Sequence, residues 1–470
     1  MFIGDVFKTT LSNIKEEDFI PASKIKNEAD QKRYKEITGF DLMLYSEVCE
    51  IVEKVNIDPS KIYFSNSSDS LSPYFYYEFP IFIEIMSMSI DFLTTFLQIE
   101  ERVSRQKGFF QRTLKEKDFD KFFAFVHTKI KIMAFNKVYE LIPKEEKYSQ
   151  FIKVYVLGDY GFQHFKKEIV EDVFNHQPDY VKQTCREELD KISNNDDIVI
   201  YRGAGKYSNP IDKAYSWTLN LRVANTFANH FENAGTVYSA TVKKSKVVDL
   251  IDDRHESEII VRPEDVENIE VFDMIDIDSE LDLMGSNGYL YHYHKFLDKL
   301  DRSLFKDPDP DGLHGYSHTQ RVLLNALSLC NAHELDDFDT TKICLAVIYH
   351  DIGRDNDEED EIHGRKSWEK LVELNIIPQL EEEFELYEDD LEIIKFLMEY
   401  HCLDDKIAWK NIESVNEGRH TDDLRFFVKL FKDADGLDRV RLKDLDSRYL
   451  RLDESKKRVN FAQQLLKSFR

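Results

Sequence analysis

The spacing of apolar residues changes twice along this chain, and these changes limit the folds that it can adopt. Up to about residue 190 apolar side chains recur with mostly helical spacing, which predicts a helical region over residues 1–120. Near Asp197 the pattern changes to short β-branched runs, which continue to about residue 275. From about residue 290 helical spacing returns without a credible strand. We therefore expect an α+β multidomain protein.

The β-rich segment predicts a set of short strands separated by polar turns. They are expected at residues 198–201, 236–242, 247–251, 257–261 and 269–272. An acidic stretch that ends in Gly-Ser-Asn-Gly at residues 285–288 indicates a domain boundary. The expected domains are a helical region of unknown role at 1–120, a mixed α/β domain at 121–278 and an all-α domain at 288–470.

Length and composition indicate a large globular protein. At 470 residues the chain exceeds what one hydrophobic core usually organises, and its 42% hydrophobic residues can fill several cores. The 90 acidic and 63 basic side chains leave a net charge of −27, which repels phosphate backbones at long range. Broad non-specific binding of nucleic acid is therefore disfavoured.

The cysteines and the most apolar segment bear on location. Five cysteines are scattered without CxxC spacing, which favours a reducing cytoplasm over a disulfide framework. The apolar stretch at 74–99 contains Glu78, Glu84 and Asp91, so we expect a buried core helix and not a membrane span. The first residues lack the pattern of a secretory signal. We expect a cytoplasmic protein without a membrane partner.

Four short signatures in the C-terminal third combine histidine with aspartate. They are His314-Gly-Tyr-Ser-His318, Tyr349-His350-Asp351-Ile-Gly-Arg354, His363-Gly-Arg-Lys-Ser367 and Lys432-Asp433-Ala-Asp435-Gly-Leu-Asp438. Imidazole and carboxylate groups supply the nitrogen and oxygen donors that Mn, Fe, Ni, Co or Mg accept. A metal held in this way polarises a phosphoryl oxygen and lowers the pKa of bound water, which favours hydrolysis of phosphate esters.

Over roughly residues 290–450 this pattern resembles the HD-domain metal-dependent phosphohydrolases, an all-helical family. The resemblance implies a divalent-metal cofactor, a nucleotide or other phosphate ester as substrate, and a catalytic role for Asp351. The implied metal ligands are His318, His350, Asp351 and Asp435. Residues for a second metal or for the substrate are His363, His401, Arg321, Arg354 and Lys432. One or two metals remain open, and His363 and His401 are equally compatible with solvated or capping histidines. Asp435 is chosen over Asp433 because it stands in the Ala-Asp-x-Leu frame, and Asp433 and Asp438 are expected to cap or to pair with basic neighbours.

Three fragments of the β-rich segment carry further chemistry. Arg202 can bind a diphosphate, and Ser216, with Trp217 and Thr218, is expected to open a helix as its N-cap, with the helix continuing through Phe231. Glu256 and Glu258 are two residues apart, which on a strand would place both carboxylates on one face. One carboxylate of such a pair can stabilise an oxocarbenium-like cation while the other removes a proton.

At these residues, over roughly 120–275, the chain resembles the ADP-ribosyltransferases of the R-S-E class, although Ser-Trp-Thr replaces the family's Ser-x-Ser or Ser-Thr-Ser. The resemblance implies NAD as cofactor and a protein or nucleic-acid acceptor of ADP-ribose. Glu258 would be the catalytic glutamate and Glu256 would activate the acceptor. The NAD site would include Arg202, Ser216, Thr218 and Phe227. The alternative is a turn arginine, a capping serine and a solvated strand face.

The combined interpretation is a bifunctional enzyme with ADP-ribosyl transfer in the middle domain and metal-dependent phosphoester hydrolysis in the C-terminal domain. Such a pairing favours a bacterial or phage toxin or defence effector. Two alternatives stay open: a hydrolase whose middle domain only binds nucleotides, and a nucleotide-sensing regulator of a docked partner.

Overall fold

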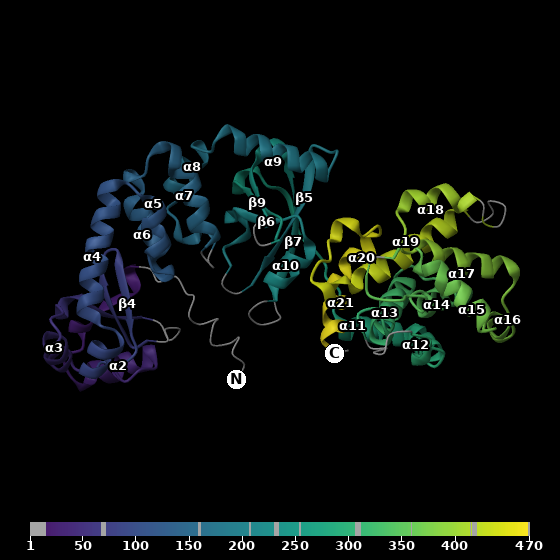
Figure 1. Ribbon diagram of the computed structural model, residues 1–470, viewed down its shortest axis with the longest axis horizontal. Helices are drawn as coiled ribbons and strands as arrows, with labels where there is room; N and C mark the ends of the chain where they lie inside the picture. Colours follow the sequence, from purple (N-terminus) through teal and green to yellow (C-terminus); the bar gives the residue numbers. More distant parts are fainter. Residues whose placement is uncertain are drawn as a thin grey trace.

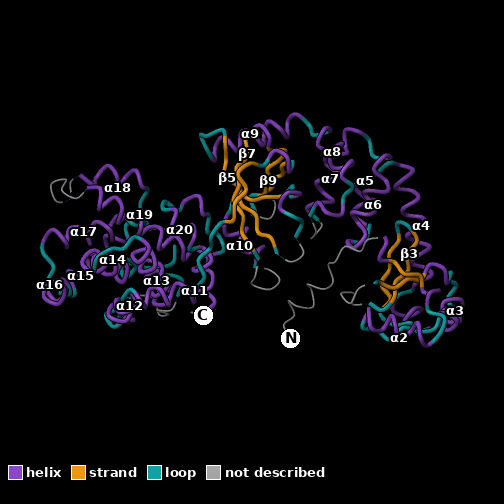
Figure 2. Tube along the Cα trace, turned by 180° about the vertical axis from the view of Figure 1, so that it is seen from behind, coloured by secondary structure: helices purple, strands orange, loops and turns teal. Residues whose placement is uncertain are grey.

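The structure is a computed structural model that describes residues 16–66, 72–157, 161–205, 208–229, 235–252, 255–305, 312–358, 360–413, 415 and 421–468. The molecule is elongated, with one sheet in the purple and dark blue part on the left, a larger sheet in the middle and a mass of helices in the green and yellow part on the right (Figure 1). Figure 2 shows the same order from behind. The three parts follow one another in space as they do in the sequence.

The region expected to be helical contains a four-stranded antiparallel sheet of order β1-β2-β3-β4. Its strands are β1 (Phe19–Pro21), β2 (Ile62–Ser65), β3 (Tyr74–Glu78) and β4 (Ile81–Ile85). The helices beside it are α2 (Glu28–Thr38), α3 (Tyr45–Glu53) and α4 (Ile99–Glu116). The prediction of a helical region over residues 1–120 is therefore wrong for this part.

The apolar stretch at 74–99 explains the error. It forms β3, β4 and a π-helix (Phe92–Phe96) instead of one buried helix. Both strands are buried at nearly every position, so the alternation that marks a half-buried strand is absent from the sequence. Pro80 lies in the turn that joins the two strands. The two strands are buried, but Met86, Ile90 and Phe96 are exposed, so the prediction of a buried core helix is wrong for the secondary structure and holds for the burial of the strands alone.

A series of helices connects this part to the middle sheet. They are α5 (Phe119–Phe125), α6 (Lys131–Val138), α7 (Lys144–Val156), α8 (Lys167–Asn175) and α9 (Asp179–Ile192). One hydrophobic cluster extends from Phe19 to Phe174, across the boundary expected at residue 120, and includes Val248 and Ile260 of the middle sheet. The N-terminal part thus packs directly against that sheet.

The middle of the chain forms a six-stranded antiparallel sheet of order β10-β7-β5-β6-β9-β8. Its strands are β5 (Asp197–Ala204), β6 (Ser216–Thr218), β7 (Thr236–Lys243), β8 (Val247–Ile251), β9 (Glu258–Val261) and β10 (Glu267–Val271). Five of them confirm the predicted strands. The sixth, β6, replaces the predicted start of a helix.

The helix after β6 begins later than expected. It is α10 (Leu221–Ala228), and the side chain of Asn220, not Ser216, accepts the capping hydrogen bond, from Arg222 N at 3.0 Å. Three residues are too few to display a strand period in the sequence, while the buried Trp217 between them fits a central strand. The expected end of the helix at Phe231 lies outside the described residues.

The described residues beyond Val271 contain helices and no strand, as predicted. They form α11 (Ile277–Ser286), α12 (Tyr289–Leu297), α13 (Tyr316–Ala332), α14 (Asp337–Tyr349), α15 (His363–Glu373), α16 (Ile377–Phe384), α17 (Glu388–Tyr400), α18 (Asp405–Asn411), α19 (Thr421–Leu437), α20 (Asp453–Lys457) and α21 (Val459–Ser468). No helix in the described part of the chain is long and apolar enough to cross a membrane.

The middle sheet and the C-terminal helices share a hydrophobic cluster. Helix α10 lies beside α21 (Figure 1), and its residues Leu221 and Ala224 are buried in the cluster that fills the C-terminal part. Asn225 Nδ2 donates to Gln463 Oε1 at 2.5 Å and to Asn460 Oδ1 at 3.1 Å. The two parts are therefore joined by apolar burial and by polar contacts.

Candidate metal centre and a second polar site

Five helices bring together side chains that are far apart in the sequence. Each donor lies at or near a helix terminus or on the inner face of a helix, and all but Asp435 are buried. His318 lies on α13, His350 and Asp351 follow α14, His363 opens α15, His401 follows α17 and Asp435 lies on α19. All six residues predicted as first or second metal ligands thus meet in one region.

Two glycines permit the close approach of the helices that carry these donors. A Cβ at Gly364 would lie 2.0 Å from the carbonyl oxygen of Met398, so α15 can touch the end of α17 only without a side chain there. A Cβ at Gly353 would lie 2.3 Å from the amide nitrogen of Ser367. The His-Asp-x-Gly and His-Gly patterns therefore reflect packing as well as chemistry.

Asp351 occupies the centre of the cluster. Its Oδ2 lies 3.5 Å from His318 Nε2 and 3.4 Å from His350 Nε2. Its Oδ1 lies 3.1 Å from His363 Nε2 and 3.9 Å from His401 Nε2. The two oxygens of one carboxylate thus face two different pairs of histidines.

Asp435 closes the first of these groups. Its Oδ1 lies 3.4 Å from His318 Nε2, and His318 Nε2 lies 3.3 Å from His350 Nε2. Asp433, the alternative considered from the sequence, accepts instead from the backbone N–H groups of Arg451 and Leu452 at 2.8 and 2.9 Å. The structure places Asp435, and not Asp433, beside the histidines.

The hydrogen bonds of the other ring nitrogen fix how each imidazole faces the cluster. Nδ1 of His350 contacts Val347 O at 2.6 Å, Nδ1 of His401 contacts Met398 O at 2.6 Å, and Nδ1 of His363 contacts Asp360 O. A carbonyl oxygen only accepts, so each Nδ1 carries a hydrogen and each Nε2 faces inward. Three Nε2 atoms therefore face the carboxylate of Asp351 and are placed to act as ligands.

His318 has the same orientation with a stronger partner. Its Nδ1 donates to Asp438 Oδ2 at 2.7 Å, and Asp438 in turn accepts from Arg321 Nε at 2.6 Å. A carboxylate behind a ligating histidine fixes the ring and raises its basicity. Asp438 pairs with basic neighbours, as predicted.

A buried group of acceptors facing one another is unfavourable without a positive charge between them. Two sets of three of these side chains have possible ligand atoms within 4.8 Å of one another, as a metal site requires: His318, His350 and Asp435, and His350, Asp351 and His401. Imidazole nitrogens and carboxylate oxygens are suitable ligands for divalent transition metals. The donor set therefore fits a divalent metal, with His318, His350, Asp351 and Asp435 around one position.

The ionisation of the cluster shows the same need for positive charge. Burial lowers the pKa of the His318 imidazole and Arg441 lowers it further, but hydrogen bonds to Asp351, Asp435 and Asp438 outweigh both and raise it to about 10. Burial and the neighbouring His350 and His363 lower the pKa of His401 to about 3. In the metal-free protein a proton on His318 thus supplies part of the missing charge.

Residues 315–440, which contain all six donors, match a family model. The family is the HD domain. No curated protein and no solved structure matched the chain. The match covers the C-terminal part of the chain and extends neither to the two sheets nor to α20 and α21.

Within the HD domain the three cations predicted to bind substrate phosphate already have protein partners. Arg321 binds Asp438, and Arg354 Nε donates to Asp351 Oδ1 at 2.9 Å. Lys432 Nζ donates to Asp405 Oδ1 at 2.6 Å and to the carbonyl of Leu403. Arg354 therefore supports the metal-facing Asp351, Arg321 supports Asp438 behind His318, and Lys432 joins α18 to α19.

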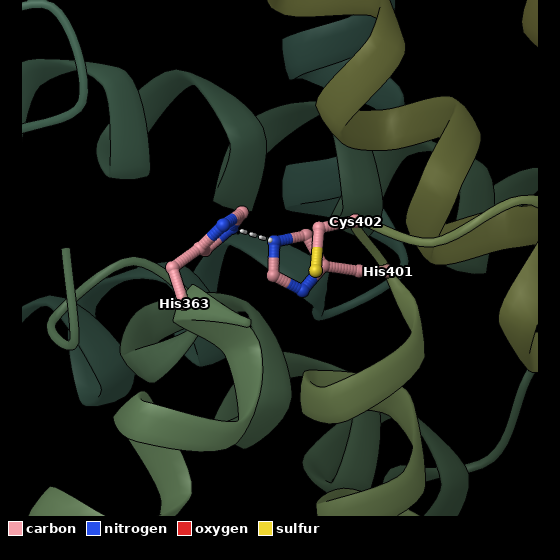
Figure 3. Close-up of side chains that lie close together, drawn as sticks. All are labelled: His363, His401 and Cys402. Carbon is pink, nitrogen blue, oxygen red and sulfur yellow. Dashed lines mark hydrogen bonds between the residues drawn. The ribbon is translucent and has the colours of Figure 1, made fainter. Parts of the chain in front are cut away.

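Two residues of the HD domain site were not assigned from the sequence. His314 Nδ1 lies 3.1 Å from Asp351 Oδ2, and Cys402 forms a close group with His363 and His401 (Figure 3). His314 was part of a recognised signature but had no role. Cys402 could have been found because it repeats, after His401, the position that Asp351 occupies after His350.

The middle sheet brings together the other predicted site. Arg202 on β5, Ser216 on β6 and Glu258 on β9 come from three adjacent strands. Arg202 Nη1 donates to Ser216 O, and Ser216 Oγ donates to Glu258 Oε1. Within the described part of the chain, the buried Nε of Arg202 has no hydrogen-bond partner. Such a donor is suited to an anionic ligand.

Two details of this site differ from the prediction. Strand β9 begins at Glu258, and Ser257 before it has a φ of 45°, so Glu256 and Glu258 do not share a strand face. Glu256 contributes its backbone carbonyl, which accepts from Thr218 Oγ1 at 2.5 Å. The sequence could not show this turn, because positive φ at a serine has no spacing signature.

Phe227 was the aromatic residue predicted for this site, whereas Tyr155, which contacts the site, was not predicted. Phe227 lies on α10 and its side chain is about half exposed. Tyr155 on α7 donates its hydroxyl hydrogen to Glu258 Oε1. The two residues are 103 positions apart in the sequence, and Tyr155 belongs to none of the motifs described above. Glu258 is therefore held by Ser216 and Tyr155 in the buried part of the sheet.

Proposed function

We propose that the HD domain hydrolyses a phosphate ester, with a divalent metal held by His318, His350, Asp351 and Asp435. The observation that supports this proposal is the convergence of imidazole nitrogens and carboxylate oxygens from distant positions of the chain on one place, with the buried Asp351 between the histidines. The match of residues 315–440 to the HD domain adds the reaction class.

The residues of the chain supply orientation and shielding. Carbonyls and Asp438 hold the imidazoles in the tautomer that ligates, and Arg354 holds Asp351. Asp435, whose side chain is one third exposed, marks the accessible edge where substrate enters. A divalent metal, when bound, polarises the phosphoryl group and acidifies a water molecule. The substrate class is a nucleotide or another phosphate ester.

The first test measures bound metal and phosphatase activity together. Metal-stripped full-length protein, reloaded with Mn²⁺, Co²⁺, Fe²⁺, Ni²⁺ or Mg²⁺, is assayed on a panel of nucleotides and phosphate esters. In Asp351→Ala we expect bound metal and activity to fall by roughly 100-fold or more, because even a residue behind a ligand is worth roughly 10- to 100-fold.

The matched control is His294→Ala, which removes an exposed histidine from α12 of the same part of the chain. It should keep both the metal and the activity. Metal content that is the same in Asp351→Ala and in the wild type would contradict the assignment.

A second candidate function is NAD-dependent ADP-ribosyl transfer by the middle domain, over residues 121–278. The observation that favours it is the hydrogen-bonded series from Arg202 through Ser216 to Glu258 on adjacent strands, with an unsatisfied guanidinium nitrogen beside it. In this proposal Arg202 binds the diphosphate of NAD, and Glu258 stabilises the cation that forms when nicotinamide leaves.

This candidate is tested by the release of nicotinamide from NAD. Glu258→Gln keeps the shape of the side chain but removes the charge, and should abolish release. Glu270→Gln changes an exposed glutamate on β10 of the same sheet and should have no effect. NAD binding without release in the wild type would instead favour a nucleotide sensor, the alternative function of this domain.

A further inference from the structure

The ends of α14 and α17 have the same local structure. His350 and His401 are the residues that terminate them, with φ and ψ of −61° and −36° in the first case and −62° and −35° in the second. Each ring donates from Nδ1 to the carbonyl three residues earlier at 2.6 Å. The residue after His350 is Asp351, which faces the metal centre, and the residue after His401 is Cys402.

Cys402 also lies where a ligand would be placed. Its sulfur belongs with His363 and His401 to a group whose possible ligand atoms lie within 4.8 Å of one another (Figure 3). His363 Nε2 and His401 Nε2 are 2.8 Å apart and share a hydrogen bond, and each would offer a lone pair to a metal, because each Nδ1 is bound to a carbonyl. Asp351 Oδ1 lies 3.1 Å from His363 Nε2 and supplies an oxygen at the same place.

The present contacts of the thiol are weak. Its Sγ lies 3.4 Å from the carbonyl oxygen of Glu361 and 3.8 Å from that of Glu399. Since a thiol is a weak donor, exchanging these contacts for a metal bond costs little. The side chain is partly exposed, so its proton can pass to solvent.

We propose that Cys402 is a thiolate ligand of a second metal position, which it forms with His363, His401 and Oδ1 of Asp351. The proposal rests on the function proposed above, because Asp351 is shared with the first position. On binding, the S–H bond breaks, the proton goes to solvent and the sulfur electron pair forms the bond to the metal.

This assignment makes the two positions chemically different. The first offers two imidazoles and carboxylate oxygens, whereas the second adds a soft sulfur to two imidazoles. Thiolate with imidazole favours zinc, iron(II) or cobalt(II), and disfavours magnesium and manganese. The second position therefore selects a softer ion than the first.

Cobalt(II) absorption tests the proposal, since a cobalt–thiolate bond gives a charge-transfer band in the near ultraviolet that nitrogen and oxygen ligands do not give. Metal-stripped full-length protein is titrated with cobalt(II). We expect two bound ions and the sulfur band in the wild type. In Cys402→Ser the band and one of the two ions should be lost, while the visible absorption of the first position remains.

The matched control is Cys49→Ser, a cysteine of α3 that is also partly exposed and should leave the spectrum unchanged. Bound cobalt without the sulfur band in the wild type would overturn the role of Cys402, and phosphatase activity in the same sample would show that the proposed function stands. A wild-type protein that binds no cobalt would overturn both proposals. A band that persists in Cys402→Ser would also overturn the assignment.

Discussion

At the scale of residues, the HD domain site depends on which ring nitrogen of each histidine forms a hydrogen bond to the protein and which one faces the metal centre. The sequence identified the donor residues because histidine and aspartate recur in a family pattern. It could not identify the partners of two cationic side chains. Arg321 binds a carboxylate 117 positions away in the chain, and Lys432 binds one that is 27 positions away. The packing of the folded chain decides which carboxylate a long cationic side chain can reach, and the spacing of residues in the sequence does not show this packing.

The raised pKa of His318 predicts proton release on metal binding. With a pKa of about 10, the ring is protonated at pH 7 in the metal-free protein, and a ligating ring must be neutral. One metal at the first position should therefore release about one proton, and its affinity should rise about tenfold per pH unit up to about pH 10.

Calorimetry in buffers of different ionisation enthalpy measures this proton. Cys402→Ser is the suitable background, because it removes the proton of the thiol from the count. His401 adds none, since its pKa of about 3 leaves it neutral. A binding heat that does not depend on the buffer would contradict the prediction.

At the scale of elements, the strands of the middle sheet were predictable because β-branched runs alternate with polar turns. The first sheet was not, because β3 and β4 are buried on both faces and therefore read as one apolar run. The same limit applied to β6, which has only three residues. The helices around the metal centre were predictable as helices, but their closeness depends on Gly364 and Gly353.

Gly364→Ala should force α15 away from the end of α17. Its new Cβ would meet the Met398 carbonyl at 2.0 Å, and backbone cannot yield as a side chain can, so we expect a loss of about 1–3 kcal/mol in the free energy of unfolding. Denaturant unfolding measures it. Gly285→Ala, where the nearest atom lies at an ordinary 3.5 Å from the new Cβ, should be neutral or stabilising. Equal stability of both variants would show that α15 can shift freely.

At the scale of the whole molecule, the middle sheet connects two regions that the sequence presents as separate domains. Two tyrosines of α7 bind it to the N-terminal helices: Tyr155 donates to Glu258 of β9, and Tyr148 donates to Asp249 of β8. On its other side, α10 packs beside α21, and both helices contribute residues to the hydrophobic cluster that fills the C-terminal part. Such contacts between parts of the molecule could not be predicted, since they depend on how the folded helices and strands pack against one another.

Asn225→Ala should loosen this junction without disturbing the first sheet. The side chain is 2% exposed and donates to both Gln463 and Asn460, so its loss removes the donor of two partly buried amide oxygens and costs about 1 kcal/mol. Hydrogen exchange followed by mass spectrometry should show faster exchange in α10 and α21, and no change in β1–β4. Gln183→Ala, an exposed amide on α9, should change neither. Uniform acceleration across the chain would indicate general unfolding instead.

The two oxygens of Asp351 face opposite halves of the metal centre. Loss of a single histidine would remove one ligand from one half and leave the other half with its donors, so such mutants are expected to retain partial function. A mutation of the shared carboxylate has no such intermediate outcome. Among natural variants of this chain, tolerated diversity should therefore be found at the peripheral donors before it is found at this one.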